Sequence, residues 1–310
     1  MAGRIVILGV FVADTAYRAD RPPKMGETIL GNSFKLGPGG KGSNQAVAAA
    51  RAGGDVHFVS RLGEDAFATM ADRIWQDAGV KPAVTRDPEN YTGAAYIFVE
   101  EATGNNAIII CPGAAGDISA GDLDARSDLI SGAALFVTQL EQPIEAAMRG
   151  LEIARAAGVR TILNPAPAAP IPPDMLSLCD FVTPNESEVE ALTGLQVETP
   201  DDAARAAAAL IAKGVGAAII TLGEKGALYK DDQMELHVPA FTAGPVVETT
   251  GAGDAFNGGF AAALAEGADP VSAVRFGSAV AGISVTRAGA APSMPTRAEI
   301  DALLDRLPSS

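Results

Sequence analysis

The chain has 310 residues, enough for one large α/β domain or two smaller ones, and 48% of the residues are apolar while only 5% are aromatic. Its formal net charge of −15 argues against nucleic acid or an anionic membrane as the main partner, although an anionic small ligand responds only to its local site. The two cysteines, Cys111 and Cys179, have neither metal-ligand spacing nor the number of a disulfide framework, so the cytoplasm is the expected compartment.

Apolar runs and helical patterns alternate along most of the chain. The first apolar run, Arg4–Val10, is too short to span a membrane and predicts a buried strand. Further strands are predicted at Val56–Ser60, Ala134–Gln139, Arg160–Asn164, Phe181–Pro184 and Ala217–Leu222, and helices at Ser43–Ala52, Ala66–Ala78, Ile144–Ala157, Asp201–Lys213, Ala252–Glu266 and Pro270–Thr286. This order favours a doubly wound, mostly parallel sheet with helices on both faces.

Two segments interrupt the alternation. Thr28–Leu36 is predicted as a strand, and Ala94–Cys111 as a hairpin around the turn-rich EATGNN. These strands would form either a small flap over the ligand edge of the sheet or an ordinary antiparallel edge. The proline-rich stretch Asn164–Pro173 predicts a rigid loop that needs no functional explanation.

The stretch Gly251-Ala252-Gly253-Asp254 opens a long apolar helix, although glycine weakens a helix interior by about 1 kcal/mol per position. A helix N-terminus carries unpaired N–H groups and partial positive charge, and glycines let a phosphate approach them. Asp254 beside such an anion cradle would be a base for phosphoryl transfer. The equally weighted alternative is close helix packing, with Asp254 as an N-terminal cap.

A second glycine-rich opening, Gly37–Gly42, formally matches the dinucleotide fingerprint G-x-G-x-x-G. It follows a flap candidate rather than the first sheet strand, and Pro38 lacks a backbone donor, so an NAD-dependent oxidoreductase is disfavoured. What remains is a backbone nest beside Lys41 and Asn44 that suits hydroxyl groups or a phosphate, or else a turn followed by a helix cap at Ser43.

Gly39–Ala48 (GGKGSNQAVA) and Thr249–Phe260 (TTGAGDAFNGGF) resemble the two signatures of the ribokinase-like carbohydrate kinases. NPAP (Asn164–Pro167), TPNESEVEALTG (Thr183–Gly194) and TLGEKGAL (Thr221–Leu228) follow in the order and spacing of the ribokinase subgroup. The resemblance covers essentially the whole chain. It implies a single kinase domain over residues 1–310, folded as a three-layer α/β/α sandwich, with a small β-sheet lid inserted from about 12–38 and 91–111.

The resemblance also implies an activity, the ATP-dependent phosphorylation of a sugar hydroxyl, which is O5 of D-ribose in the ribokinase subgroup. Asp254 matches the catalytic base and Gly251, Ala252 and Gly253 match the anion hole. The sugar-binding positions map to Asp14, Gly40, Lys41, Asn44 and Glu141. The nucleotide-binding positions map to Asn185, Thr221, Gly223, Gly226, Gly253 and Ser278. A non-catalytic sugar sensor is the alternative, which the intact Asp254 and its glycines disfavour.

Metal ions and a partner subunit are implied as well. Glu188 matches the acidic residue that organises hydrated Mg²⁺. A monovalent cation, K⁺ by expectation, has ligands that map to Glu248, Thr250, Ser284, Arg287, Gly289 and Ser293, some through backbone carbonyls. The subgroup pairs as homodimers, lid against lid.

Two positions depart from the subgroup pattern. Val12 stands where a ribokinase commonly has asparagine, and valine cannot hydrogen-bond a sugar hydroxyl, so strict ribose specificity weakens. Deoxyribose or another pentose becomes a candidate substrate. Glu248 replaces the usual aspartate, which puts the monovalent-cation site in question. A nucleoside kinase of the same fold is a further alternative, but it wants an aromatic side chain beside the base, and few aromatics, Phe11 and Tyr96 among them, fall near the site.

Overall fold

The computed structural model describes residues 3–306. The strands are β1 (Arg4–Leu8), β2 (Val12–Ala19), β3 (Ser33–Gly39), β4 (Asp55–Leu62), β5 (Lys81–Arg86), β6 (Thr92–Glu100), β7 (Asn106–Gly113), β8 (Leu135–Thr138), β9 (Arg160–Leu163), β10 (Phe181–Val182), β11 (Ala217–Thr221), β12 (Ala227–Lys230) and β13 (Glu235–Val238). The helices are α1 (Lys41–Arg51), α2 (Ala66–Ala78), α3 (Ala120–Asp124), α4 (Ser127–Ser131), α5 (Ile144–Ala156), α6 (Glu186–Thr193), α7 (Pro200–Ile211), α8 (Ala252–Ala265), α9 (Pro270–Ser284) and α10 (Arg297–Leu304). Short 3₁₀ helices lie at Ala114–Asp117, Met175–Leu178, Gly223–Lys225 and Ala291–Ser293.

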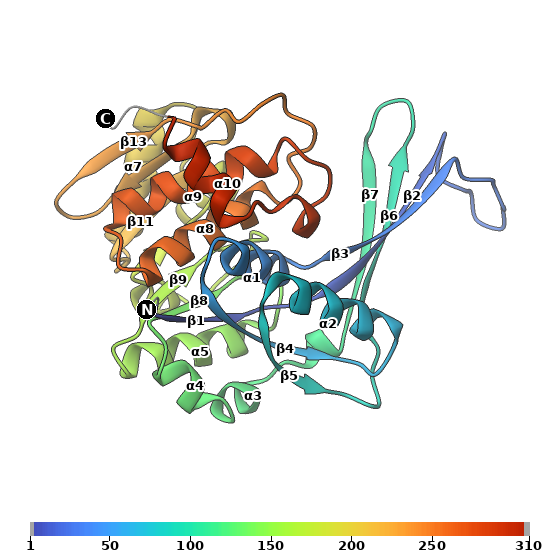
Figure 1. Cartoon of the computed structure of the whole chain (residues 1–310), viewed down its shortest axis with the longest axis horizontal. Coiled ribbons are helices and arrows are strands. Elements are labelled where there is room, and N and C mark those ends of the chain that lie inside the picture. Colours follow the sequence, from blue (N-terminus) through green and yellow to red (C-terminus); the bar gives the residue numbers. More distant parts are fainter. Residues whose placement is uncertain (1–2, 307–310) are drawn as a thin grey trace.

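The large sheet has the strand order β13–β12–β11–β10–β9–β8–β1–β4–β5 (Figure 1). All its pairs from β11 to β5 are parallel, and β12 and β13 are added antiparallel at one edge. Each parallel connection in this region needs a crossover, and helices supply most of them. The sheet therefore brings the carboxyl ends of β9, β10 and β11 to one edge, where loops from different parts of the sequence meet.

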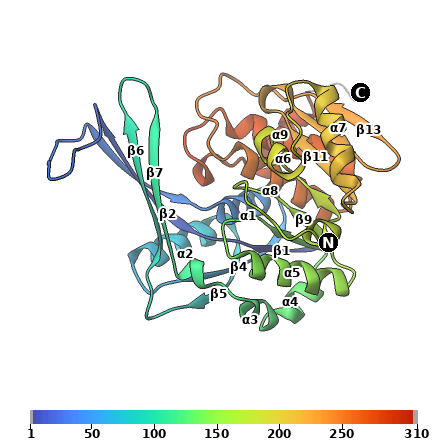
Figure 2. The same ribbon diagram turned by 180° about the vertical axis from the view of Figure 1, so that it is seen from behind.

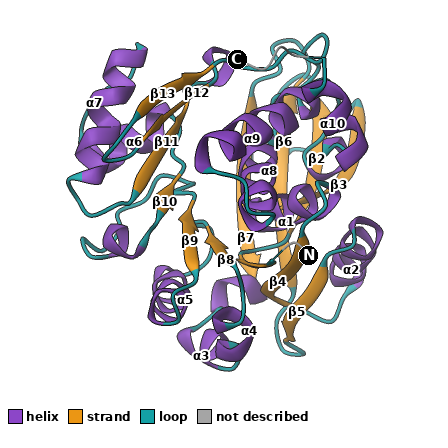
Figure 3. Ribbon diagram, turned by 60° about the vertical axis from the view of Figure 1, so that its left-hand side comes forward, coloured by secondary structure: helices purple, strands orange, loops and turns teal. Residues whose placement is uncertain are grey.

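Helices cover both faces of this sheet (Figure 3). On β1, Ile5 and Ile7 pack into one apolar cluster with residues of α1, α2, α8, α9 and α10, while Val6 and Leu8 pack into a second cluster with residues of α3 to α7. Successive side chains of a strand point to opposite faces of the sheet, and here the side chains on both faces are buried against helices. This is why the central strands read in the sequence as continuous apolar runs, and it makes the fold a three-layer sandwich.

A second sheet, in the order β3–β2–β6–β7, extends away from the sandwich (Figures 1 and 2). Its register places Leu36, Thr15, Tyr96 and Ile109 in one cross-strand row. Asp14 alternates with Thr15 along β2, so it lies on the opposite face of this sheet. The small sheet therefore has one face that carries Asp14 and another that carries exposed apolar side chains.

The predicted strands and helices of the sandwich are confirmed to within about three residues at each end, and so is the Ala94–Cys111 hairpin, formed by β6 and β7. The predicted strand Thr28–Leu36 is wrong in its first half, because pairing with β2 begins only at Ser33 opposite Arg18. Sequence patterns do not predict the two edge strands β5 and β13, nor β12 beside β13, because these strands are short or carry charged residues. Among residues 3–306, no helix combines the length and apolar character needed to cross a bilayer.

Candidate functional site

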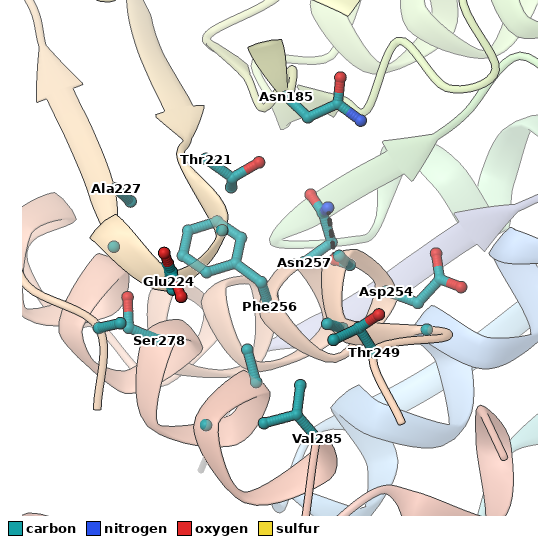
Figure 4. Close-up of a pocket in the computed structure, with 18 of the residues that line it drawn as sticks. Asn185, Thr221, Glu224, Ala227, Thr249, Asp254, Phe256, Asn257, Ser278 and Val285 are labelled. Carbon is teal, nitrogen blue, oxygen red and sulfur yellow. Dashed lines mark hydrogen bonds between the residues drawn. The ribbon is translucent and has the colours of Figure 1, made fainter. Parts of the chain in front are cut away.

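A cleft of about 480 Å³ opens along the carboxyl ends of β9, β10 and β11 and is closed on one side by the start of α8. Several positions predicted for catalysis or for binding the nucleotide, the sugar or Mg²⁺ line it (Figure 4). They are Lys41, Asn185, Glu188, Thr221, Gly223, Gly226, Gly251, Ala252, Gly253, Asp254 and Ser278. Residues separated by more than two hundred positions in the sequence thus share one cavity.

The start of α8 is shaped by its glycines. Gly251 is the N-cap in a left-handed conformation, φ 78°, and a Cβ there would lie 2.7 Å from the Cβ of Ala290. The Ala252 N–H donates to the Thr249 carbonyl at 3.1 Å, whereas Gly253 and Asp254 lie in the first turn, where N–H groups have no partner within the helix. A Cβ on Gly253 would meet nothing within 4 Å. The positive end of the helix dipole is therefore open to the cleft.

Asp254 is not the cap of this helix, whose N-cap is Gly251, so the cap half of that alternative is wrong, while Gly251 does allow close packing against Ala290. Its side chain is 7% exposed and accepts hydrogen bonds from Asn44 Nδ2 at Oδ2 (3.0 Å) and from Gln45 Nε2 at Oδ1 (3.1 Å). Burial raises the pKa of this carboxyl, while the charge of Lys41 and the two amide bonds lower it. The Asp254 carboxylate is therefore desolvated by burial, and the two amide hydrogen bonds hold it in a fixed orientation.

Lys41 and Glu141 meet beside Asp254. The Lys41 backbone N–H donates to Glu141 Oε2 at 2.6 Å, so Glu141 anchors α1 rather than capping α5, whose N-cap is Pro143. Burial raises the pKa of Glu141 to about 7, against the opposing charge of Lys41. Ser43 lies inside α1 and accepts a hydrogen bond from Trp75 Nε1, so the predicted helix cap at Ser43 is also wrong.

The small sheet brings its own predicted positions to this end of α1. Asp14 lies against Gly39, where a Cβ would be 2.4 Å from its carboxylate, and burial raises the pKa of Asp14 to about 6. Gly40 has φ 91°, and a Cβ there would lie 2.4 Å from the Val10 carbonyl oxygen. Val12 is 6% exposed at the start of β2. Gly39 thus makes room for the Asp14 carboxylate, and Gly40 allows the close approach of the Val10 backbone.

Asn185 and Glu188 form a reciprocal capping box at the start of α6. Asn185 Oδ1 accepts from the Glu188 N–H (2.9 Å), and Glu188 Oε2 accepts from the Asn185 N–H (2.9 Å). Glu188 is 7% exposed and burial raises its pKa, so it is not a solvated surface charge. Thr221, Phe256 and Ser278 lie farther along the same cleft (Figure 4).

The positions expected to hold a monovalent cation lie around the loop after α9. The structure joins two of them, because Glu248 Oε2 accepts a hydrogen bond from the Gly289 N–H at 2.8 Å. The Ser284 hydroxyl donates to Ala281 O (2.8 Å), the Ser293 hydroxyl donates to Ala290 O (2.7 Å), and Arg287 pairs with Glu299. Across residues 3–306, no group of three or more His, Cys, Asp or Glu side chains is arranged to hold a metal ion.

Sequence reasoning missed a group of buried polar side chains at the wall of the cleft, three of which, Asn164, Thr183 and Asn257, line it. Gln45, Asn164, Thr183 and Asn257 are each at most 6% exposed and are joined to one another by hydrogen bonds. Asn164 shows that the start of the proline-rich stretch has a place in the site, contrary to the expectation of a loop without function. The available signal was a polar residue inside an apolar run, such as Gln45 before Ala46–Ala50.

The aromatic side chains considered for a nucleoside base lie elsewhere. Phe11 is fully buried and packs against Trp75 with ring centroids 5.8 Å apart. Tyr96 packs against Tyr17, on the face of the small sheet opposite Asp14. Neither side chain lines the cleft.

Comparison with known proteins agrees with this geometry. Residues 3–297 match the profile of the pfkB family of carbohydrate kinases. A ribokinase from Haemophilus influenzae is 37% identical over 300 residues, which cover 96% of this chain and 97% of the relative. A deoxyribokinase from Salmonella typhi is 38% identical over 294 residues, which cover 94% and 95%. The structure of an Arabidopsis thaliana ribokinase complexed with ribose and ATP matches 99% of this chain and 100% of its own, with a TM-score of 0.94 and 33% identity.

The family profile spans almost the whole chain, and full-length relatives share more than a third of its residues. The chain therefore belongs to the pfkB family of carbohydrate kinases.

Proposed function

We propose that this carbohydrate kinase transfers the γ-phosphoryl group of ATP to a hydroxyl of a free pentose, O5 of D-ribose in the first instance, with Asp254 as general base. One observation carries the proposal: a buried aspartate, oriented by two amides, lies in the first turn of a helix whose N-terminus opens into a cleft. A sugar hydroxyl held there would give its proton to Asp254 while the helix N-terminus stabilises charge on the migrating phosphoryl group.

The sugar would lie between the small sheet and the start of α1, held by Asp14, Gly40, Lys41, Asn44 and Glu141. Two observations support this placement. Asn44 Oδ1 is buried without a hydrogen-bond partner, which leaves an acceptor for a hydroxyl donor. Asp14 and Glu141 have raised pKa values because of burial, and hydroxyl donors from a sugar would stabilise their ionised forms.

The nucleotide would occupy the cleft between Asn185 and Ser278, with its phosphates toward Gly253. Thr221, Gly223 and Gly226 lie along this path, and Phe256 offers an apolar surface beside it. Glu188 offers carboxylate oxygens, the type of ligand that Mg²⁺ prefers. Hydrated Mg²⁺ held there would neutralise charge on the phosphates. Oxygen donors at Glu248, Thr250, Ser284, Arg287, Gly289 and Ser293 would hold K⁺ beside the helix that carries the anion hole.

A second substrate is favoured by a specific observation. Val12, almost fully buried at the start of β2, offers no hydrogen bond to a sugar hydroxyl. An apolar contact discriminates little against a missing hydroxyl, whereas a polar contact discriminates strongly. Phosphorylation of 2-deoxyribose is therefore the alternative activity, and the similarity to a deoxyribokinase supports it equally.

The remaining parts of the proposal concern the whole chain. Residues 1–310 act as one kinase domain in which the small sheet, inserted from about 12–38 and 91–111, closes over the sugar as a lid. Closure would exclude water and limit the hydrolysis of ATP. The outer face of the lid would pair with a second copy to form a homodimer.

The test is a coupled assay of ADP release with Mg²⁺ and D-ribose, 2-deoxyribose, D-fructose or adenosine, each with and without K⁺. The proposal expects pentose-dependent turnover, stimulated by K⁺, and little turnover of adenosine. Turnover restricted to adenosine, or ADP release that no sugar stimulates, would contradict it. A higher kcat/KM for deoxyribose than for ribose would select the alternative substrate.

A further inference from the structure

A closed circuit of side-chain hydrogen bonds runs beneath the catalytic end of α8. Gln45 Nε2 donates to Asp254 Oδ1 (3.1 Å) and to Asn164 Oδ1 (3.0 Å). Asn164 Nδ2 donates to the Thr183 carbonyl (3.0 Å), and the Thr183 hydroxyl donates to Asn257 Oδ1 (2.6 Å). Asn257 is itself on α8, and its Nδ2 donates to the Gly253 carbonyl one turn earlier (2.9 Å), next to Asp254 (Figure 4).

The orientation of Gln45 within this circuit is fixed from both ends. Its Oε1 accepts from Gln139 Nε2 at 2.6 Å, so its NH₂ group must point toward Asp254 and Asn164. Gln45 and Gln139 are both 0% exposed, so water does not compete for these bonds. A buried amide with all of its groups bonded has one allowed orientation, because any rotation would leave donors and acceptors unpaired.

We propose that Gln45 is a positioning residue for the phosphoryl transfer: through its bond to Oδ1 it sets the rotation of the Asp254 carboxylate and favours the ionised form that accepts the substrate proton. It touches neither sugar nor nucleotide and acts only through Asp254. This inference rests on the proposed kinase function and names a residue that the sequence did not indicate.

Several charged groups around Asp254 favour or oppose its ionised form, and the hydrogen bond from Gln45 acts beside them. Lys41 on α1 favours the ionised form, while Glu141 after β8 and Glu188 on α6 are like charges that oppose it, and Asp14 on β2 lies beside Glu141. Asn44 supplies the other amide, at Oδ2. Lys41 and Asn44 also face the proposed sugar, so substrate binding draws on them. Gln45 is the donor whose bond does not depend on substrate.

The experiment compares wild type, Gln45→Met and Gln45→Asn in kcat, KM and pH profile. Methionine has a similar length and no donor, and asparagine keeps an amide too short to reach both Gln139 and Asp254. Loss of a hydrogen bond to the ionised carboxylate should move the acid limb of kcat up by about one to two pH units. At pH 7, kcat should fall about ten- to hundredfold, within the ~10²–10⁴ that a general base contributes, with KM values changed less than about threefold.

The matched control is Thr161→Val on β9, which removes a buried hydroxyl bonded to the Leu178 carbonyl at 2.7 Å, far from Asp254. It should lower stability without moving the acid limb. If wild type releases ADP with a pentose but both Gln45 variants keep its acid limb, or lose activity only in proportion to lost stability as Thr161→Val does, the inference is overturned. If wild type shows no sugar-dependent turnover, the proposed function fails first and the inference fails with it.

Discussion

Asp254, the proposed general base, combines burial with hydrogen bonding. The side chain is nearly inaccessible to solvent, which raises its pKa, but two amides and Lys41 keep a charged carboxylate tolerable there. A carboxylate in bulk water would be a weaker and less directed base. The same surroundings make the position intolerant of change.

The Asp254→Asn variant should lose pentose phosphorylation by about 10²–10⁴-fold while ATP binding stays within about threefold of wild type, because asparagine preserves size and removes the base. Steady-state kinetics and calorimetric titration with ATP measure the two properties separately. Turnover at the wild-type rate would show that another group accepts the proton.

Glu141, a proposed sugar-binding residue, makes the stability of the protein depend on pH. Its pKa is raised from 4.5 to about 7 by burial, so the folded protein holds a proton that the unfolded chain has released. The unfolding free energy contributed by this group therefore falls as pH rises from about 4.5 to about 7, and the loss is complete above pH 7. Asp14, raised to about 6, acts with the same sign.

The Glu141→Gln variant cannot ionise at this position, so it escapes that loss. We expect its unfolding free energy, relative to wild type, to increase from pH 5 to pH 8 by on the order of 2 kcal/mol, while its KM for the pentose rises. Urea denaturation at the two pH values measures the difference. A gap between variant and wild type that does not change with pH would contradict the assignment.

At the scale of elements, the start of α8 shows why glycine can serve two purposes within three residues. Gly251 is required by conformation, since φ is 78° and a Cβ would collide with Ala290. Gly253 is required by neither conformation nor packing, since a Cβ there would meet no protein atom within 4 Å. Its open side faces the cleft, where the proposal places the migrating phosphoryl group.

This pair makes a matched test of fold against function. Gly253→Ala should keep or raise stability by about 0.5–1 kcal/mol, because alanine favours a helix, yet lower kcat more than about tenfold by filling the anion site. Gly251→Ala should destabilise the protein by about 1–2 kcal/mol or more through the left-handed backbone and the contact with Ala290. Thermal unfolding and kinetics of both variants separate these effects. If Gly253→Ala kept wild-type kcat, the migrating phosphoryl group would not bind at the start of α8.

At the scale of the whole molecule, the small sheet leaves an apolar face uncovered. Tyr17, Phe34, Leu36, Tyr96 and Ile109 lie on the face opposite Asp14 and are each 38% exposed or more. Contiguous exposed apolar side chains of this kind mark an interaction surface. A second copy of the same face would cover them by isologous contact.

We expect wild type to be a dimer through this face and the Ile109→Lys variant to be a monomer, because each copy would have to bury an unpaired lysine charge in the apolar interface. Sedimentation velocity of both proteins measures the state. Met234→Lys, which replaces an exposed apolar side chain after β12, is the control and should remain dimeric. A monomeric wild type, or a dimeric Ile109→Lys, would exclude this face as the interface.

The sequence by itself determined the sandwich and the ends of most of its elements. A strand such as Arg4–Leu8 is buried on both faces of the sheet, so its successive residues are apolar. Such a run can be recognised from its own residues without knowledge of its partner strands. Gly251–Asp254 was recognisable for the same reason, because a helix start needs only neighbouring residues. Edge strands such as β5 and the loop before Ser33 were not determined in this way, since pairing there depends on whether a partner strand is within reach.

Only the tertiary structure decided which polar side chains meet Asp254. Gln45 lies 209 positions from Asp254 in the sequence, and Asn164 is the second acceptor of the Gln45 amide. Local sequence patterns do not indicate that either side chain meets Asp254 or its hydrogen-bond partners. Their hydrogen bonds exist because α1, β9, β10 and α8 converge at one edge of a parallel sheet. That convergence is a property of strand order, which local sequence patterns do not encode, and it gives the carboxylate at a recognisable helix start its fixed orientation.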